Sequence, residues 1–213
     1  MGAWCSWLAH RPVKPEAAGS SPVAPARKFR GAVEKTHSPF FVSCVRGGKA
    51  MDMHVFDDDF FRGFPYRPEG FFLDRRAEVD RSEQRIVCTM DTSQKFPLVE
   101  AQRNHDQIHP PHLPGAVIVH LTGMVGLAAA QIFLGIRFDA GWSGYGSRIH
   151  KAEFKRLVRL GPPVRLEGRI TSDRRRGGMA ILRYEFRFFQ EGALFYFGDQ
   201  TAVYRRFEVG GPI

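Results

Sequence analysis

Side chains capable of acid–base chemistry are concentrated in one short segment of the chain, Asn104–His120. Four of the eight histidines of the protein lie here, together with Asp106. Histidine and aspartate can supply a base and an acid near neutral pH. The segment is therefore the first candidate for a catalytic site, with these imidazoles: His105, His109, His112 and His120.

Pro114-Gly115 closes this segment and precedes twenty-one almost uniformly apolar residues, Ala116–Ile136. By length alone such a stretch could cross a membrane. It contains polar side chains, however, and a helix that is apolar on all sides can instead be enclosed by a sheet. We expect a buried core helix and no membrane span. The N–H groups at its start, from Gly115 and Ala116, could hold an oxygen as it gains negative charge.

The elements around this helix alternate between apolar and polar residues with a period of two, as half-buried strands do. Turns are expected at Asp173–Gly178, where Gly177-Gly178 supplies the positions with positive φ, and at Glu191-Gly192. We interpret Gly141–Gly146 as a connector. Two strands, one buried helix and four further strands predict an α+β fold, with an antiparallel sheet wrapped around one helix. The predicted strands are Phe71–Asp80, Arg85–Asp91, Arg148–Val158, Val164–Thr171, Leu182–Phe188 and Ala193–Arg205.

The positive charge of the protein lies mostly outside this pattern. Residues 1–50 hold eight Lys or Arg and two Asp or Glu, and so supply +6 of the net charge of +9. A nucleic-acid footprint is therefore poorly supported, and we expect no nucleic-acid partner. Three cysteines form no disulfide framework, which suits a reducing cytoplasm.

Residues 1–50 show neither strand nor helix periodicity and are rich in Pro, Ser, Gly and Ala. The stretch Trp4–Ala26 resembles peptides produced when translation is read through an upstream tRNA gene. We expect a spurious extension, with the true start at Met51 or Met53; a disordered tail is the alternative. The domain organisation is then an extension (1–50), a lead-in segment (51–67), one folded domain (68–207) and a tail (208–213).

The histidine-rich segment has three open interpretations. As a metal site, His105, His109 and His112 have suitable ligand types. Pro110-Pro111 denies them a regular helix, however, and no standard ligand spacing is matched, so we predict no metal. As a structural loop, the histidines would bond backbone groups or face water. The third interpretation is an acyl-thioester site, in which His120 is either catalytic or a hydrogen-bonded core histidine.

The motifs resemble two related families of the hotdog fold. His109–His120 is similar to the entrance of the 3-hydroxyacyl-carrier-protein dehydratases, GHFPxxPxxPG followed by a carboxylate on the helix. It is more similar to the A-factor biosynthesis (AfsA-type) domain, which has HPxDHxPGMxxLEA there. Asp173–Gly178 (DRRRGG), Glu191-Gly192 and Ala202–Arg206 (AVYRR) resemble the closing hairpin of the AfsA-type domain. The resemblance spans about residues 68–207.

The resemblance implies a single hotdog fold acting on an acyl thioester of carrier protein or coenzyme A. The position of the family's helix carboxylate corresponds to His120 in this chain, and the position of the dehydratase histidine corresponds to Asp106, next to His105. Relative to the family, the acid and the base have therefore exchanged places. We expect these three residues to be catalytic, with no cofactor. Gly115 would stabilise the oxyanion and Ala116 would contact the substrate. His109 and His112 would also contact the substrate.

The family's sites lie between paired hotdog units, which implies a homodimer for a chain with length for one unit. The implied reaction is acyl transfer to a small hydroxylated acceptor. The alternatives are a 3-hydroxyacyl-thioester dehydratase, a thioesterase and a non-catalytic acyl-binding protein.

Overall fold

The computed structural model describes residues 51–208, so the predictions for residues 1–50 and for the tail after Glu208 lie outside the described residues. In chain order the elements are β1 (Asp52–Val55), α1 (Asp58–Arg62), the 3₁₀ helix η1 (Pro68–Gly70), β2 (Arg76–Asp80), β3 (Arg85–Met90), α2 (Pro97–Glu100), α3 (Gly115–Leu134), the 3₁₀ helix η2 (Phe138–Ala140), β4 (Trp142–Phe154), β5 (Val164–Arg176), β6 (Met179–Gln190) and β7 (Ala193–Arg206).

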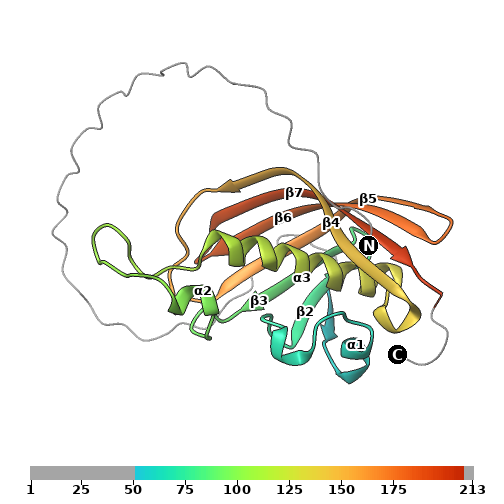
Figure 1. The fold of residues 1–213 in the computed structure, drawn as a ribbon, viewed down its shortest axis with the longest axis horizontal. Coiled ribbons are helices and arrows are strands. Elements are labelled where there is room, and N and C mark those ends of the chain that lie inside the picture. The colour runs from blue at the N-terminus through green and yellow to red at the C-terminus, as the bar shows by residue number, and fades with distance from the viewer. Residues whose placement is uncertain (1–50, 209–213) are drawn as a thin grey trace, which may run out of the picture. The chain divides into compact units, whose positions relative to one another are not determined.

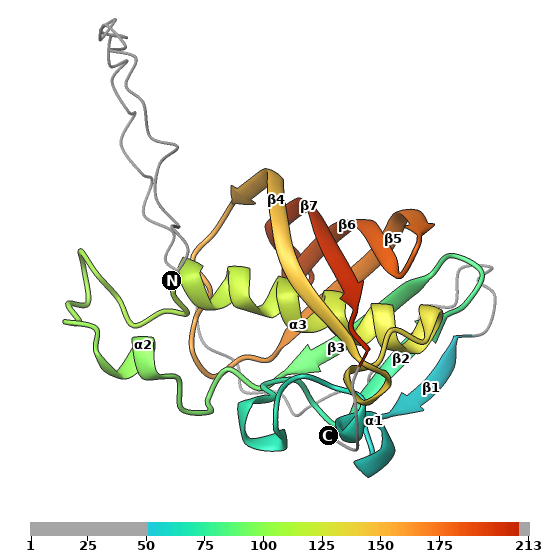
Figure 2. The same ribbon diagram turned by 45° about the vertical axis from the view of Figure 1, so that its right-hand side comes forward.

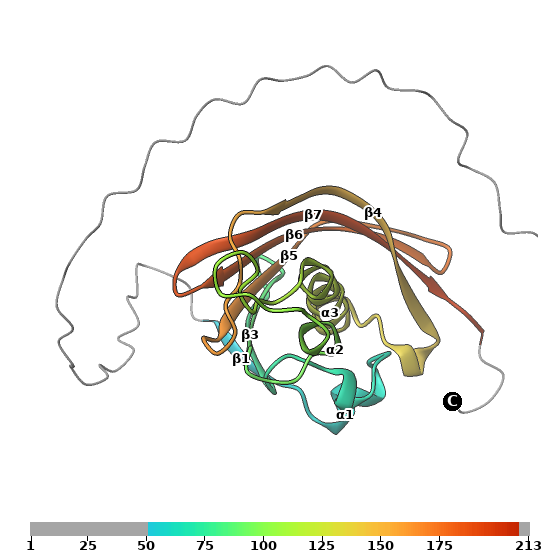
Figure 3. The same ribbon diagram turned by 60° about the vertical axis from the view of Figure 1, so that its left-hand side comes forward.

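The strands of the described residues form one antiparallel sheet in the order β1-β2-β3-β5-β6-β7-β4. The sheet arches over α3, which runs along its concave side (Figure 1, Figure 3). β4 is the first strand after α3, and it lies at the far edge of the sheet, where it pairs with β7. The predicted fold class, an antiparallel sheet wrapped around one long helix, is confirmed.

Two tight hairpins join the strands β5, β6 and β7. β5 and β6 are joined by Gly177 and Gly178, with φ of 55° and 74°, and β6 and β7 by Glu191 and Gly192, with φ of 50° and 76°. Two-residue turns with positive φ at both positions match the right-handed twist of the flanking strands. The predicted turn positions are confirmed. So is the alternation of β5 and β6, whose inward residues are buried against α3.

Four strand predictions were wrong in their bounds. β5 extends to Arg176 rather than ending at Thr171, and β6 covers Met179–Gln190 rather than Leu182–Phe188. β2 begins at Arg76 rather than near residue 70, because Phe71 and Leu73 enter the core from a loop. β4 covers Trp142–Phe154, so most of the run interpreted as a connector is strand. Most of β4 is exposed on both faces, which explains its weak alternation. Gly144 is required by packing, since a Cβ at this position would lie 2.4 Å from Cε1 of Tyr204.

Helix α3 is the centre of the core. It begins at Gly115 and ends at Leu134, where Gly135 takes a left-handed conformation with φ of 65°. Its buried side includes Leu121, Met124, Val125, Ala128 and Ala129, all 0% exposed. α3 is long and apolar enough to cross a membrane by length and composition, but 61% of its most apolar window is buried within the protein.

The lead-in segment is packed on the same helix. β1 extends the sheet beside β2, and α1 lies on the side of α3 that faces away from β5–β7 (Figure 2). Phe56, Phe60, Phe64 and Phe71 form an aromatic cluster there. Nε2 of Gln131 on α3 donates a 2.8 Å hydrogen bond to the carbonyl oxygen of Phe60. These contacts leave one side of α3 open between the lead-in segment and β4.

Candidate functional site

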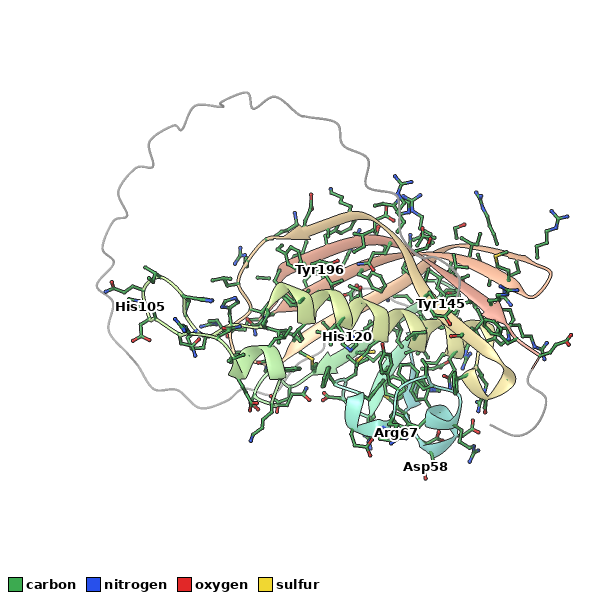
Figure 4. The ribbon with its side chains drawn as sticks, in the orientation of Figure 1. Asp58, Arg67, His105, His120, Tyr145 and Tyr196 are labelled. Carbon is green, nitrogen blue, oxygen red and sulfur yellow. The ribbon has the colours of Figure 1, made fainter. Side chains whose placement is uncertain are left out.

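The histidine-rich loop forms a projecting arm (residues 102–112). The backbones of His105 and His109 exchange two hydrogen bonds of 2.9 Å, which close a tight turn with Ile108 82% exposed near its end. Nδ1 of His105 accepts from the backbone N–H of Gln107 at 3.2 Å. His105 and Asp106 are both exposed. Figure 4 shows His105 at the outer end of the arm, far from His120, so one copy of the chain does not bring these residues together.

His109 and His112 lie at the base of the arm. Their ring centroids are 4.9 Å apart, and Nδ1 of His112 is 2.8 Å from the carbonyl oxygen of Pro110. His105 does not join them: among residues 51–208, no three His, Cys, Asp or Glu side chains are arranged to hold a metal ion. The base of the arm is held by Gln102, whose Nε2 donates to the carbonyl oxygen of His112 at 2.8 Å.

The start of α3 is held in place by a buried glutamine of β6. Nε2 of Gln190 donates to the carbonyl oxygens of Arg159 and Pro162, both at 2.9 Å, and its Oε1 accepts from the N–H of Arg159 at 3.0 Å. In the same loop, the carbonyl oxygen of Val158 accepts a 2.9 Å hydrogen bond from the N–H of Leu113. The loop after β4 therefore fixes the residues from which α3 begins.

The N-terminus of α3 presents free N–H groups. Pro114 is the N-cap and provides no side-chain hydrogen bond, while its carbonyl oxygen accepts from Val117 and Ile118. Among residues 51–208, no acceptor is found for the N–H of Gly115 or Ala116. A helix N-terminus with free N–H groups carries positive potential and attracts an oxygen with negative charge.

His120 lies further along the same helix and is half-buried. Its ring is edge-on to Tyr66 and Phe72, at centroid distances of 5.6 Å and 5.9 Å. Burial lowers the pKa of His120, and no hydrogen bond to its ring is found among the described residues. It is therefore not a hydrogen-bonded core histidine. A neutral imidazole with both nitrogens free of protein partners is suited to accept a proton.

A cavity of about 150 Å³ opens between α3 and the strands β4, β6 and β7. Gly123 lies one turn after His120, on the neighbouring part of the helix surface, and Tyr66 both lines the cavity and contacts the His120 ring. His120 is not among the residues that line the cavity, and it adjoins the cavity through its contact with Tyr66. Sequence reasoning missed the cavity; the signal was the glycines that line it, Gly123, Gly126, Gly144 and Gly146.

The cavity has polar groups on its wall and floor. Oγ1 of Thr122 lies 2.7 Å from the carbonyl oxygen of Val119 and 2.9 Å from Oε1 of Gln200. The hydroxyl oxygens of Tyr184 and Tyr204 are 2.7 Å apart. Burial raises the pKa of Tyr204 to about 12 and raises that of Tyr184 well above its usual value, so both are protonated at neutral pH.

A second depression, of about 270 Å³, lies on the convex face of the sheet. Arginine and glutamate side chains line it, and some of them pair with one another, as Nε of Arg187 does with Glu185 at 2.9 Å. It includes no residue of α3. The candidate site is therefore the smaller cavity, which adjoins both His120 and the helix.

Searches against protein-family models and against curated proteins find no match. Solved structures do match. The dehydratase heterocomplex ApeI:P from Xenorhabdus doucetiae has a TM-score of 0.51 and 13% identity, over 69% of this chain and 90% of that chain. A mutant thioesterase from Pseudomonas aeruginosa has a TM-score of 0.45 and 14% identity, over 65% and 85%. The E. coli PaaI protein from the phenylacetic acid degradation operon has 0.42 and 14%, over 68% and 85%.

At these identities the similarity shows a shared fold. The chain has the hotdog fold, as the sequence predicted.

Proposed function

We propose that the protein is an acyl-thioester enzyme in which His120 is the general base. The observation that carries the proposal is the position of this imidazole: half-buried, without a hydrogen-bond partner among the described residues, and in contact with Tyr66, which lines a cavity beside α3. Its lowered pKa keeps it neutral at pH 7, the state in which it can accept a proton.

The proposed reaction is acyl transfer to a hydroxylated acceptor. The substrate carbonyl oxygen is bound by the N–H groups of Gly115 and Ala116, and His120 takes the proton of the acceptor hydroxyl as its oxygen attacks the carbonyl carbon. The tetrahedral intermediate then collapses: the C–S bond breaks, and the imidazolium of His120 returns the proton to the departing sulfur.

The spacing along α3 suits this reaction. Gly115 and His120 are five residues apart, about 7.5 Å along the helix axis. A carbonyl oxygen, the reacting carbon and the attacking oxygen span a similar length when each oxygen makes a hydrogen bond of about 2.9 Å. This axial spacing supports the proposal that the helix N-terminus and the imidazole act on one reacting centre.

The proposed assembly is a homodimer. β4 is an edge strand, and 50–60% of the surface of each of its side chains Tyr145, Ile149 and Phe154 is exposed. An exposed apolar edge strand of this kind can pair with a second chain. A second copy also offers a place for the arm, whose His105 lies away from His120 of its own chain, with the exposed Asp106 next to it in the sequence. In this proposal the two residues act in the site of the other copy, while His109 and His112 line the substrate entrance.

The proposed substrate is a thioester of coenzyme A or of an acyl-carrier protein. The AfsA-type resemblance of residues 68–207 supports transfer to an acceptor hydroxyl rather than to water. An assay can distinguish acyl transfer from dehydration, because a dehydratase produces an enoyl thioester and releases no thiol.

The test is to replace His120 with Ala and measure thiol release from a panel of acyl-coenzyme A thioesters, with and without a hydroxylated acceptor such as glycerol. General base catalysis contributes about 10²–10⁴-fold, so we expect a loss of at least 100-fold. The matched control is His150→Gln, an exposed histidine of β4. Retention of activity in the His120 variant rejects the assignment, and enoyl absorbance without thiol release replaces transfer with dehydration.

A further inference from the structure

The floor of the cavity is made by two tyrosines from neighbouring strands. Tyr184 of β6 and Tyr204 of β7 are each only 2% exposed, and their hydroxyl oxygens are 2.7 Å apart. Both rings reach glycines that also line the cavity. A Cβ at Gly126 would lie 3.7 Å from Cζ of Tyr184, and a Cβ at Gly144 would lie 2.4 Å from the ring of Tyr204. The two phenol groups therefore meet at the cavity.

The hydrogen bond between the two hydroxyl groups uses only one of their two O–H donors. A pair of neutral hydroxyls shares one O–H···O hydrogen bond, whichever of them donates. Both phenols are protonated at neutral pH, so the second O–H needs a different acceptor. No acceptor for it is found among residues 51–208. A buried donor without an acceptor is unfavourable, and a ligand oxygen in the cavity would supply one.

The size of the cavity limits what can enter it. An engineered protein cavity of about 150 Å³ binds benzene, and the cavity here has about that volume. The space exists because glycines stand where side chains would fill it: Gly123 and Gly146 have nothing within 4 Å of an added Cβ. The cavity thus accepts a group the size of one six-membered ring, and its tyrosine floor stops a longer chain.

We propose that the cavity receives the distal end of the acyl group and that this end carries an oxygen, with a hydroxylated aromatic ring as the best fit. The oxygen accepts the free O–H of the Tyr184–Tyr204 pair, and the ring lies against α3 at Gly123 and Gly126. This inference rests on the proposed function only for the thioester end: Gly123 is eight residues from Gly115, about 12 Å along the helix axis, so a linker joins the ring to the thioester carbonyl. A saturated chain without the oxygen is disfavoured, because it leaves the donor unpaired.

The first test measures binding without any reaction. p-Cresol and toluene differ by one hydroxyl and both fit the cavity, so their dissociation constants for the full chain are compared by NMR titration. We expect p-cresol to bind at least 10-fold more tightly than toluene. The decisive variant is Tyr184→Phe with Tyr204→Phe, because each single variant keeps one O–H. We expect the preference to fall to about 1 in the double variant.

The double variant should fold, since replacing both partners of a hydrogen bond by apolar groups of the same shape is nearly neutral. Tyr196→Phe is the matched control: it removes a buried tyrosine hydroxyl, which accepts from Nε2 of Gln200 at 3.0 Å, and Tyr196 is not among the residues that line the cavity. The control should keep the preference. Equal binding of the two probes, binding of neither, or a preference that survives in the double variant overturns the inference.

The second test separates this inference from the proposed function. The non-hydrolysable thioethers S-[6-(4-hydroxyphenyl)hexyl]-, S-(6-phenylhexyl)- and S-decyl-coenzyme A, which have similar reach, are compared in the same titration. We expect the hydroxyphenyl thioether to bind most tightly. A preference for the decyl thioether overturns the inference but leaves an acyl-thioester site in place. p-Cresol binding without binding of any thioether keeps the cavity assignment and counts against the proposed function.

Discussion

Replacing Gly168 with Ala should loosen the contact between α3 and the sheet. Gly168 lies in β5 on the concave face, and an added Cβ would lie 2.5 Å from Cγ1 of Val125 and 3.3 Å from the ring of Phe186. Both neighbours are buried, at 0% and 1% exposure, so neither can turn into solvent. Adding a methyl group to a packed core costs about 1–3 kcal/mol. We expect a loss of about 2 kcal/mol in the free energy of unfolding.

A second substitution tests whether Val125 is the cause. Val125→Ala removes two methyl groups, worth about 0.8 kcal/mol each, and leaves a small void, for a loss of about 2 kcal/mol in total. In the double variant the new methyl group at position 168 occupies the space that Val125 vacates. The double variant should therefore lose about 2 kcal/mol rather than the sum of about 4 kcal/mol. The coupling energy of about 2 kcal/mol is typical of residues in direct contact.

Urea unfolding of the four proteins measures these energies. For a domain of this size, 1 kcal/mol corresponds to about 2–4 °C in Tm, so thermal unfolding gives a second measure. Gly146→Ala is the matched control, because it adds the same methyl group to a strand glycine with nothing within 4 Å. Losses that simply add, or a Gly168 variant as stable as the control, would refute this account of the helix–sheet contact.

Two further predictions concern the site and its surroundings. Burial lowers the pKa of His54 and of His120, so the unfolded chain binds more protons than the folded chain below pH 6.5. The free energy of unfolding should therefore be highest above pH 6.5 and decrease as the pH falls below it. Urea titrations at pH 7.5 and 5.5 measure this decrease, which should be smaller in His54→Phe. Gly123→Leu should raise helix stability by up to about 1 kcal/mol while its side chain covers the cavity, so p-cresol binding should be lost without any loss of Tm.

The sequence predicted the parts of the fold in which local pattern and tertiary role agree. β5 and β6 alternate because one face packs on α3 and the other faces solvent, and their turns carry the residues that positive φ requires. Gly144 is the opposite case. Glycine is depleted in strands, but only glycine allows Tyr204 to lie against β4. The reason for the residue is thus a contact about sixty positions away, which periodicity does not register.

The site divides in the same way. His120 could be proposed from the sequence, because its place on the helix follows from counting along a motif. The cavity beside it could not, since its walls come from the lead-in segment, α3, β4, β6 and β7. The arm is a case in which a sequence prediction went too far. His105, Asp106 and His120 are close in sequence, but the backbone hydrogen bonds between His105 and His109 close a turn that carries His105 and the exposed Asp106 away from the helix. Proximity in sequence therefore predicted a catalytic group that one copy of the chain does not assemble.

This separation changes how the exchanged acid and base should be understood. If His105 and Asp106 stood beside His120, the site would hold an acid–base pair like that of a dehydratase, with its partners exchanged. Among residues 51–208 of a single copy, no carboxylate hydrogen-bonds to His120, and burial lowers its pKa. A lone neutral imidazole can pass one proton from an attacking hydroxyl to a departing sulfur, but it cannot act as base and acid at two substrate positions at once. This argument supports the proposed acyl transfer, and the alternative of dehydration would require an acid such as Asp106 from a second copy.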